Sequence, residues 1–201
     1  MRKLLMLCLI AVLVTPLCSV ASEVQTINAN HGITIQLPTW MKVQDSNTAA
    51  ALEKIAQDSA ASQGMASATG RHIVLNASGR DMIVRLVVTT PTPATQAEIN
   101  AFKPNEILQL GKQLESQIRQ GGTGLIGGVS AYTSNKIANR RSFIYEYQRS
   151  TLLGTSAPPK RVVVYQLVSG NNLVEMTVSF PASDRAALAV LGNIQKSLRL
   201  P

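Results

Sequence analysis

The chain has 201 residues, 45% of them hydrophobic, and a formal net charge of +8 at pH 7. This length suits one domain with a sizeable core. Both cysteines, Cys8 and Cys18, lie before the region that we expect to fold. The folded region therefore has no disulfide, no thiolate metal site and no cysteine nucleophile.

The first 21 residues have the pattern of a signal peptide. A short positive start precedes an almost unbroken apolar run at residues 4–14, which has the length of a signal-peptide core and is short for a bilayer span. Small residues precede the expected cleavage between Ala21 and Ser22. The alternative is lipidation at Cys18, but Leu17 stands where such a modification normally needs a small residue.

Export determines which partners we expect. Removal of Arg2 and Lys3 lowers the basic count from 19 to 17 against 11 acidic residues, a net charge of +6. For an exported chain this charge favours an acidic protein or another anionic envelope component over nucleic acid, although it also serves solubility. No later apolar run approaches 18 residues, so we expect no transmembrane span in the mature chain. We place that chain in the periplasm or, alternatively, outside the cell.

Hydrophobic periodicity predicts the order of elements after an N-terminal extension at residues 22–30. Alternating or continuous apolar residues predict strands, and apolar residues spaced by three and four predict helices. In chain order we expect a strand at 33–37, a helix at 48–63, strands at 73–76 and 82–90, a helix at 104–120, strands at 129–134, 141–149, 162–168 and 174–180, and a helix at 183–198.

The stretch from 139 to 180 has the densest β-branched and aromatic content and predicts a meander of three antiparallel strands. Its middle strand, 162–168, is apolar on both faces, with Gln166 as its one polar residue. Such a strand is covered on both sides. We therefore expect one α+β domain over residues 31–201. Its sheet should be largely antiparallel, with about seven strands and helices packed on both faces, an α/β/α sandwich.

Two stretches at the ends of this domain carry a family resemblance. The first reads GITIQLP from Gly32 and is followed closely by Trp40; the second runs from the turn at Gly170 to the helix-ending IQKSL at 194–198. Together they resemble the PsbP-like α/β/α sandwich family, which includes exported bacterial members such as DcrB-like proteins. Thr39 departs from the glycine that often precedes the tryptophan in that family. The resemblance covers residues 30–200 and implies a scaffold whose members have diverse roles, so it implies no activity.

Residues 121–128 read GGTGLIGG and contain a literal GxGxxG from Gly122 to Gly127. A dinucleotide site places this motif between a strand and the start of a helix. Here a helix precedes it and a strand follows, so we expect no nucleotide cofactor. The simplest interpretation is a flexible connector. A second is a mobile flap that presents Leu125 and Ile126 to a partner.

No catalytic or metal-binding residue can be nominated from the sequence. His31 and His72 are the only histidines, and no cluster of further ligands surrounds them. The chain has no GxSxG motif. We expect Glu146 to form an ion pair with Arg141 or with a basic residue of the neighbouring strand, and not to act in catalysis. We therefore expect a non-enzymatic protein without a cofactor.

The best candidate binding surface is the hairpin end between the first two meander strands. Antiparallel pairing should gather Arg149, Lys160 and Arg161 there, beside a loop that carries Leu152 and Leu153. A basic rim with an apolar tip suits an acidic protein or anionic lipid headgroups. We expect a protein-binding adaptor or accessory subunit of the envelope. The alternative is a carrier of a small apolar ligand between the sheet and a helix, with the helix at 48–63 as a lid.

Overall fold

The computed structural model describes residues 23–45, 48, 51, 54, 70–122, 124–150 and 157–201. The expected signal peptide, with its cleavage between Ala21 and Ser22, lies outside these residues, and so do Leu152 and Leu153. Most of the helix predicted at 48–63 also lies outside them. Of the residues in that predicted helix, the structure describes Thr48, Ala51 and Lys54, and all three are helical.

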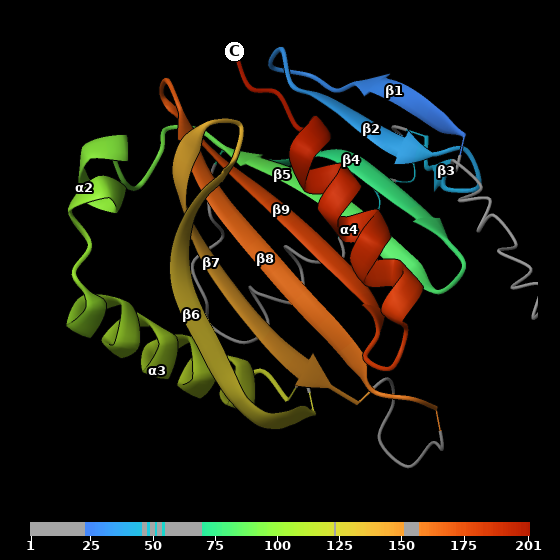
Figure 1. The fold of residues 1–201 in the computed structure, drawn as a ribbon. Coiled ribbons are helices and arrows are strands. Elements are labelled where there is room, and N and C mark those ends of the chain that lie inside the picture. Colours follow the sequence, from blue (N-terminus) through green and yellow to red (C-terminus); the bar gives the residue numbers. More distant parts are fainter. Residues whose placement is uncertain are drawn as a thin grey trace, which may run out of the picture.

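The centre of the molecule is a seven-stranded sheet in which all neighbouring strands run antiparallel (Figure 1). The strand order is β3-β4-β5-β9-β8-β7-β6. The predicted antiparallel sheet is confirmed, and the predicted meander is β7-β8-β9. The strands are β3 (Lys42–Val43), β4 (Arg71–Gly79), β5 (Met82–Thr89), β6 (Leu125–Ile137), β7 (Arg140–Arg149), β8 (Lys160–Ser169) and β9 (Asn172–Pro181).

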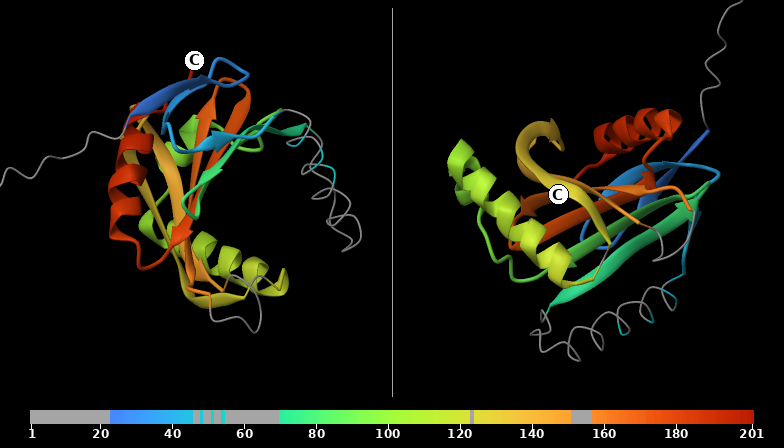
Figure 2. Two further views of the ribbon diagram at one scale, coloured as in Figure 1. Left: turned by 90° about the vertical axis from the view of Figure 1, so that its right-hand side faces the viewer. Right: turned by 90° about the horizontal axis from the view of Figure 1, so that it is seen from below.

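Helices lie on both faces of this sheet, which confirms the predicted α/β/α sandwich (Figure 2). α4 (Arg185–Ser197) covers one face, and α2 (Gln96–Ala101) and α3 (Pro104–Gln120) lie on the other. We call these the α4 face and the α3 face. α3 has the predicted bounds, whereas α2 is not among the predicted elements. Its sequence signal is the capping box of Thr95 and Glu98.

A second sheet of two antiparallel strands, β1 (Val24–Asn28) and β2 (Thr34–Pro38), lies beside α4. β2 is the strand predicted at 33–37, but it pairs with β1 and not with the main sheet. β1 falls in the predicted extension, because its sequence VQTIN offers few apolar positions. The side chains of Ile35 and Leu37 are fully buried and join β2 to the core.

The core lies mainly on the α4 face. Alternate residues of β5, β8 and β9 point to this face and pack with Leu191 and Ile194 of α4. The α3 face is more open, since Ile83 of β5 is 40% exposed. The buried strand residues are Met82, Val84, Leu86 and Val88, then Val163, Tyr165 and Leu167, and then Val174, Met176, Val178 and Phe180.

α3 approaches β6 closely at Gly111. A Cβ at this position would lie 3.1 Å from the Cβ of Ala131. Gly111→Leu is expected to lower the free energy of unfolding by about 1–3 kcal/mol, because the larger side chain must push α3 away from the strand. Gly111→Ala should stay within about 1 kcal/mol, since better helix propensity offsets the tight contact. Urea denaturation measures both, and similar effects of the two substitutions would contradict this packing.

Candidate functional site

The hairpin between β7 and β8 has the predicted pairing. Arg149 lies opposite Lys160, and Gln148 lies opposite Arg161. The three basic residues therefore meet at one end of the main sheet, where the chain leaves β7 and enters β8. Their role in partner binding stays a prediction.

The second half of the glycine-rich segment, from Leu125 on, is part of a strand, which corrects the expectation that Leu125 and Ile126 lie in a flexible connector or flap. β6 begins at Leu125, and both Leu125 and Ile126 pair with the end of β7. The register shifts between Ile126 and Ser130, which marks a β-bulge. Gly127 has a φ of 72° there, a conformation that glycine adopts easily. The bulge therefore favours a glycine, the residue type that in the sequence indicates a loop.

Alternation along the strands divides the predicted residues between two surfaces. Residues opposite each other share a face, and successive residues point to opposite faces. Leu125, Arg149 and Lys160 therefore belong to the α3 face, whereas Ile126 and Arg161 belong to the α4 face. The sequence predicts one basic rim at this end of the sheet. The structure instead places the basic residues on two separate surfaces, one on each face.

Two of the three basic side chains at this end of the sheet, Arg161 and Lys160, are paired with nearby oxygen atoms. Arg161 Nη2 donates to Glu146 Oε2 at 2.6 Å, which confirms the predicted pairing of Glu146 with a base of the neighbouring strand. Lys160 Nζ donates to the backbone oxygen of Asp81 at 2.8 Å and lies 3.8 Å from its Oδ1. Arg149 differs in that its Nε atom is buried and has no hydrogen-bond partner among the described residues.

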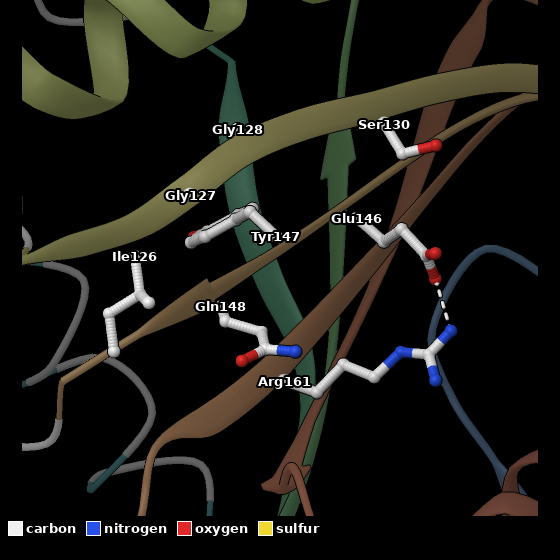
Figure 3. Close-up of a pocket in the computed structure, with 8 residues that line it drawn as sticks. All are labelled: Ile126, Gly127, Gly128, Ser130, Glu146, Tyr147, Gln148 and Arg161. Atoms are coloured by element: carbon white, nitrogen blue, oxygen red, sulfur yellow. Dashed lines mark hydrogen bonds and ion pairs between the residues drawn. The ribbon is translucent and has the colours of Figure 1, made fainter.

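A cavity of about 500 Å³ lies beside β6, and its lining comes from β6, β7 and β8 (Figure 3). Ile126, 43% exposed, lies at one side of the cavity, and the Arg161–Glu146 ion pair lies at the other. Ser130 is the strand partner of Glu146. The other lining residues are Gly127, Gly128, Tyr147 and Gln148.

α3 holds the bulge of β6 in place. Arg119 Nη2 donates to the backbone oxygen of Gly127 at 2.5 Å and to Glu115 Oε1 at 2.8 Å. Glu115 also accepts from the backbone N–H of Val129 at 3.4 Å. The hydrogen bond from Arg119, followed by that from Val129, lowers the pKa of Glu115 below its ordinary value, because both favour the charged carboxylate.

Ser130 and Gln148 are not among the predicted site residues. Neither side chain has chemistry that distinguishes it from other polar strand residues. The available signal is positional, since alternation along β7 places Gln148 on the face of Glu146. For Ser130 this signal is lost at the bulge, which breaks the alternation from Ile126.

The histidines lie apart from this site. His31 is exposed, with a φ of 62°, in the turn between β1 and β2, and His72 is exposed on β4. Within the described residues, no three His, Cys, Asp or Glu side chains gather as metal ligands would. No helix in the same part of the chain is long and apolar enough to cross a bilayer.

Two other cavities lie between the small sheet and α4. One, of about 390 Å³, has mostly polar lining residues, among them Thr26, Gln36, Lys196 and Arg199. The other, of about 50 Å³, is small compared with the roughly 300–1,000 Å³ of ligand sites. Neither favours an apolar ligand. The helix expected as a lid lies mostly outside the described residues, so the carrier hypothesis stays a prediction.

No family model and no curated protein matches this sequence. Among solved structures, the chain is similar to cyanobacterial PsbP (CyanoP) from Synechocystis sp. PCC 6803, with a TM-score of 0.50 and 9% identity over 90% of this chain and 94% of that chain. LpqN, involved in cell envelope biogenesis of Mycobacterium tuberculosis, has a TM-score of 0.41 and 11% identity over 89% and 91% of the two chains. The Saccharomyces cerevisiae Ran-binding protein Mog1p has a TM-score of 0.42 and 11% identity over 90% and 86%.

The TM-scores for LpqN and Mog1p are too low to support an inference. At 9% identity, the similarity to CyanoP shows a shared fold and leaves activity open. It agrees with the two sequence stretches that resemble the PsbP-like family. From the strand order, the helices on both faces and this similarity, we conclude that the chain has a PsbP-like α+β fold.

Proposed function

We propose that this chain is an exported, non-enzymatic accessory protein of the cell envelope that binds a protein partner at the cavity beside β6. The observation that carries this proposal is the cavity itself, which measures about 500 Å³ and has the exposed Ile126 at its side. This volume is in the range that holds a compact group. A side chain of the partner would fill the cavity, as anchor residues do at protein interfaces.

The position of β6 supports the same role. β6 is an edge strand of the main sheet, and such an edge can accept an extended segment of another protein through main-chain hydrogen bonds. At the bulge itself, the backbone oxygen of Gly127 and the N–H of Val129 already bond to Arg119 and Glu115 of α3, so the segment would pair with β6 beyond the bulge. A Cβ at Gly127 would meet nothing within 4 Å, so space remains beside the backbone at the bulge. An extended segment along β6 could therefore place one side chain in the cavity.

The cavity chemistry supports binding over catalysis. Its one carboxylate, Glu146, is held by Arg161 at 2.6 Å. Ser130 and Tyr147 are the other lining groups of a kind that catalysis uses. Among the eight lining residues, no histidine, lysine or second carboxylate accompanies them to act as their base. The signal-peptide pattern of residues 1–21 supports export.

The local charge bears on the kind of partner. Glu146 offsets Arg161 within the cavity, so an acidic partner is favoured only by the overall charge of +6 expected for the mature chain, 17 basic against 11 acidic residues. We therefore propose a protein partner with an apolar anchor, which fits the exposed Ile126.

Ile126→Asp is expected to lower recovery of the partner at least tenfold in a crosslinking pull-down from the envelope fraction. The reason is that a charge beside the anchor cavity removes apolar contact worth about 1.4 kcal/mol or more. Leu188→Asp is the matched control, because Leu188 is also 43% exposed but lies on α4. Both variants should keep the melting temperature of the unmodified protein, and unchanged recovery with Ile126→Asp would refute the site.

A further inference from the structure

The larger cavity between the small sheet and α4 gathers two basic side chains. It measures about 390 Å³, and its lining comes from β1, β2, the end of α4 and the residues just after α4. Lys196, in the last turn of α4, and Arg199, which follows the helix, both line it, and both are exposed. We call this space the small-sheet cavity. It shares no lining residue with the cavity beside β6.

No carboxylate compensates these two basic side chains. The nine lining residues include no Asp or Glu, and among the described residues neither Lys196 nor Arg199 forms an ion pair. The backbone oxygen of Pro201 lies outside the lining and accepts from Arg140 Nη2 at 2.8 Å and from Ser169 Oγ at 3.1 Å. The cavity therefore carries two positive charges that no described side chain offsets.

The C-terminal end of a helix normally disfavours an anion, because its last carbonyl groups carry partial negative charge. Here side chains already bond to those carbonyl oxygens. Arg199 Nη1 donates to the oxygens of Lys196 at 2.6 Å and Leu198 at 2.9 Å, and Ser197 Oγ donates to that of Ile194 at 2.8 Å. These bonds position the Arg199 guanidinium. Its Nε and Nη2 atoms make no hydrogen bond to a described residue and are available to a ligand.

Hydrogen bonds join the two walls of the cavity, so its shape is part of the fold. Thr34 of β2 and Arg199 exchange two backbone hydrogen bonds, at 3.1 and 2.8 Å. The N–H of Gln36 donates to Ser197 Oγ at 2.9 Å. The residues that follow α4 are therefore held beside β2, and Arg199 with them.

Neutral polar side chains complete the lining. Thr26 of β1 lies opposite Gln36 of β2, so both side chains lie on one face of the small sheet. Asn193 lies on α4 about one turn before Lys196. The hydroxyl and amide groups of these residues can donate hydrogen bonds to oxygen atoms. Donors from three elements beside two cations suit an anion better than a cation or an apolar group.

We propose that the small-sheet cavity binds a phosphate-type oxyanion between Lys196 and Arg199. The Nε and Nη2 atoms of Arg199 form a fork that matches two oxygens of such a group. A phosphate group with about two negative charges balances the two positive charges of the lining. The anion can be free phosphate or the phosphate of an anionic lipid headgroup. Because this cavity shares no lining residue with the one beside β6, the site stands or fails independently of the proposed function.

Thermal unfolding in inorganic phosphate at neutral pH tests the site. If the dissociation constant is about 1 mM, phosphate at about 20 mM should raise the melting temperature by roughly 4–7 °C over sodium chloride of equal ionic strength. Lys196→Met should reduce this increase to about 1–3 °C, because the loss of one cation weakens binding about tenfold. Lys196→Arg should keep the larger increase, since it keeps the positive charge.

Lys196 suits this test because its side chain makes no hydrogen bond to a described residue, whereas Arg199 also caps α4. Lys112→Met is the matched control, since Lys112 is exposed on α3, on the other face of the main sheet. It should keep the full increase and so account for the general stabilising effect of phosphate on folded proteins. No increase in the unmodified protein, or an equal increase in Lys196→Met, would overturn the proposal.

Nitrogen-15 NMR gives a second readout that needs no variant. Phosphate should shift the Nε–Hε signal of Arg199 and leave in place that of Arg185, which is exposed at the start of α4. Equal shifts of the two signals would overturn the site, because they would reflect general screening of surface charge.

Vesicles of phosphatidylcholine, with and without phosphatidylglycerol, distinguish the two sources of the anion. Cosedimentation that requires phosphatidylglycerol, is lost in Lys196→Met and is kept in Lys112→Met identifies a lipid headgroup. A phosphate response without cosedimentation identifies a free anion. Cosedimentation that both substitutions weaken equally reflects net charge and overturns the lipid headgroup as the source.

Discussion

Between about pH 10 and pH 12, the protein is expected to lose stability steeply, because its tyrosines resist ionisation in the folded state. Burial is the main cause that raises the pKa of all four, and the rise is largest for Tyr145 and Tyr165. Tyr165 is 1% exposed within the core on the α4 face, where Gln195 of α4 donates to its hydroxyl. The other two tyrosines are Tyr132 and Tyr147.

The sign follows from proton linkage. A tyrosine with a folded pKa above its unfolded value stabilises the fold fully below the unfolded pKa of about 10. Above that pH the unfolded chain releases the proton and the folded chain keeps it. The free energy of unfolding therefore falls by about 1.4 kcal/mol per pH unit for each such tyrosine until the folded pKa is passed. Tyr145 and Tyr165 together should remove about 5 kcal/mol by about pH 12.

Urea denaturation at increasing pH measures this loss, and phenolate absorbance recorded with circular dichroism shows when the tyrosines ionise. Phenolate absorbance should rise together with unfolding and not before it. In Tyr165→Phe, the free energy of unfolding should fall less steeply with pH. The difference should be about 1.4 kcal/mol per pH unit, which is the share of one tyrosine. Complete phenolate formation near pH 10 with the circular dichroism unchanged would contradict the prediction.

Leu86→Ala is expected to lower the free energy of unfolding by about 2–5 kcal/mol, because it leaves a cavity in the core. Leu86 is fully buried on the α4 face of β5, opposite Met176 in β9. Such a loss is a large part of the roughly 5–15 kcal/mol that stabilises a typical domain. Urea denaturation gives the value from the shift in midpoint at constant m.

Ile83→Ala is the matched control for Leu86→Ala, since Ile83 lies on the same strand but faces the other way and is 40% exposed. Its cost should stay below about 1 kcal/mol, because little apolar surface is lost from a partly hydrated site. Equal costs at the two positions would show that the α3 face is as tightly packed as the α4 face.

Several elements could be predicted because their signals are local. The strand at 162–168 is apolar on both faces, and in β8 both Val163 and Val164 are buried. α3 begins at Pro104 and ends before Gly121, as predicted. The loop between β7 and β8 places Arg149 opposite Lys160 as expected, since a hairpin constrains its own register.

Other elements depend on contacts that no short window of sequence contains. β1 is a polar strand that pairs with β2. The six-residue helix α2 has only its capping box as a local signal, and it contacts β7 through the hydrogen bond from Gln96 Nε2 to the backbone oxygen of Arg141. Gly127 looks like part of a loop but lies at a bulge that α3 stabilises through Arg119. In each case a tertiary partner outweighs a weak or misleading local preference.

The candidate sites show the same division between local and long-range information. Local alternation and helix-ending residues were enough to set the order of elements and the antiparallel meander. The cavity beside β6 joins Ile126 to Glu146 and Arg161 across three strands, and the glycine-rich sequence before Ser130 gives no sign of this. They meet because the long-range strand order and register place their side chains on one face, just as the same register assigns Arg149 to the other.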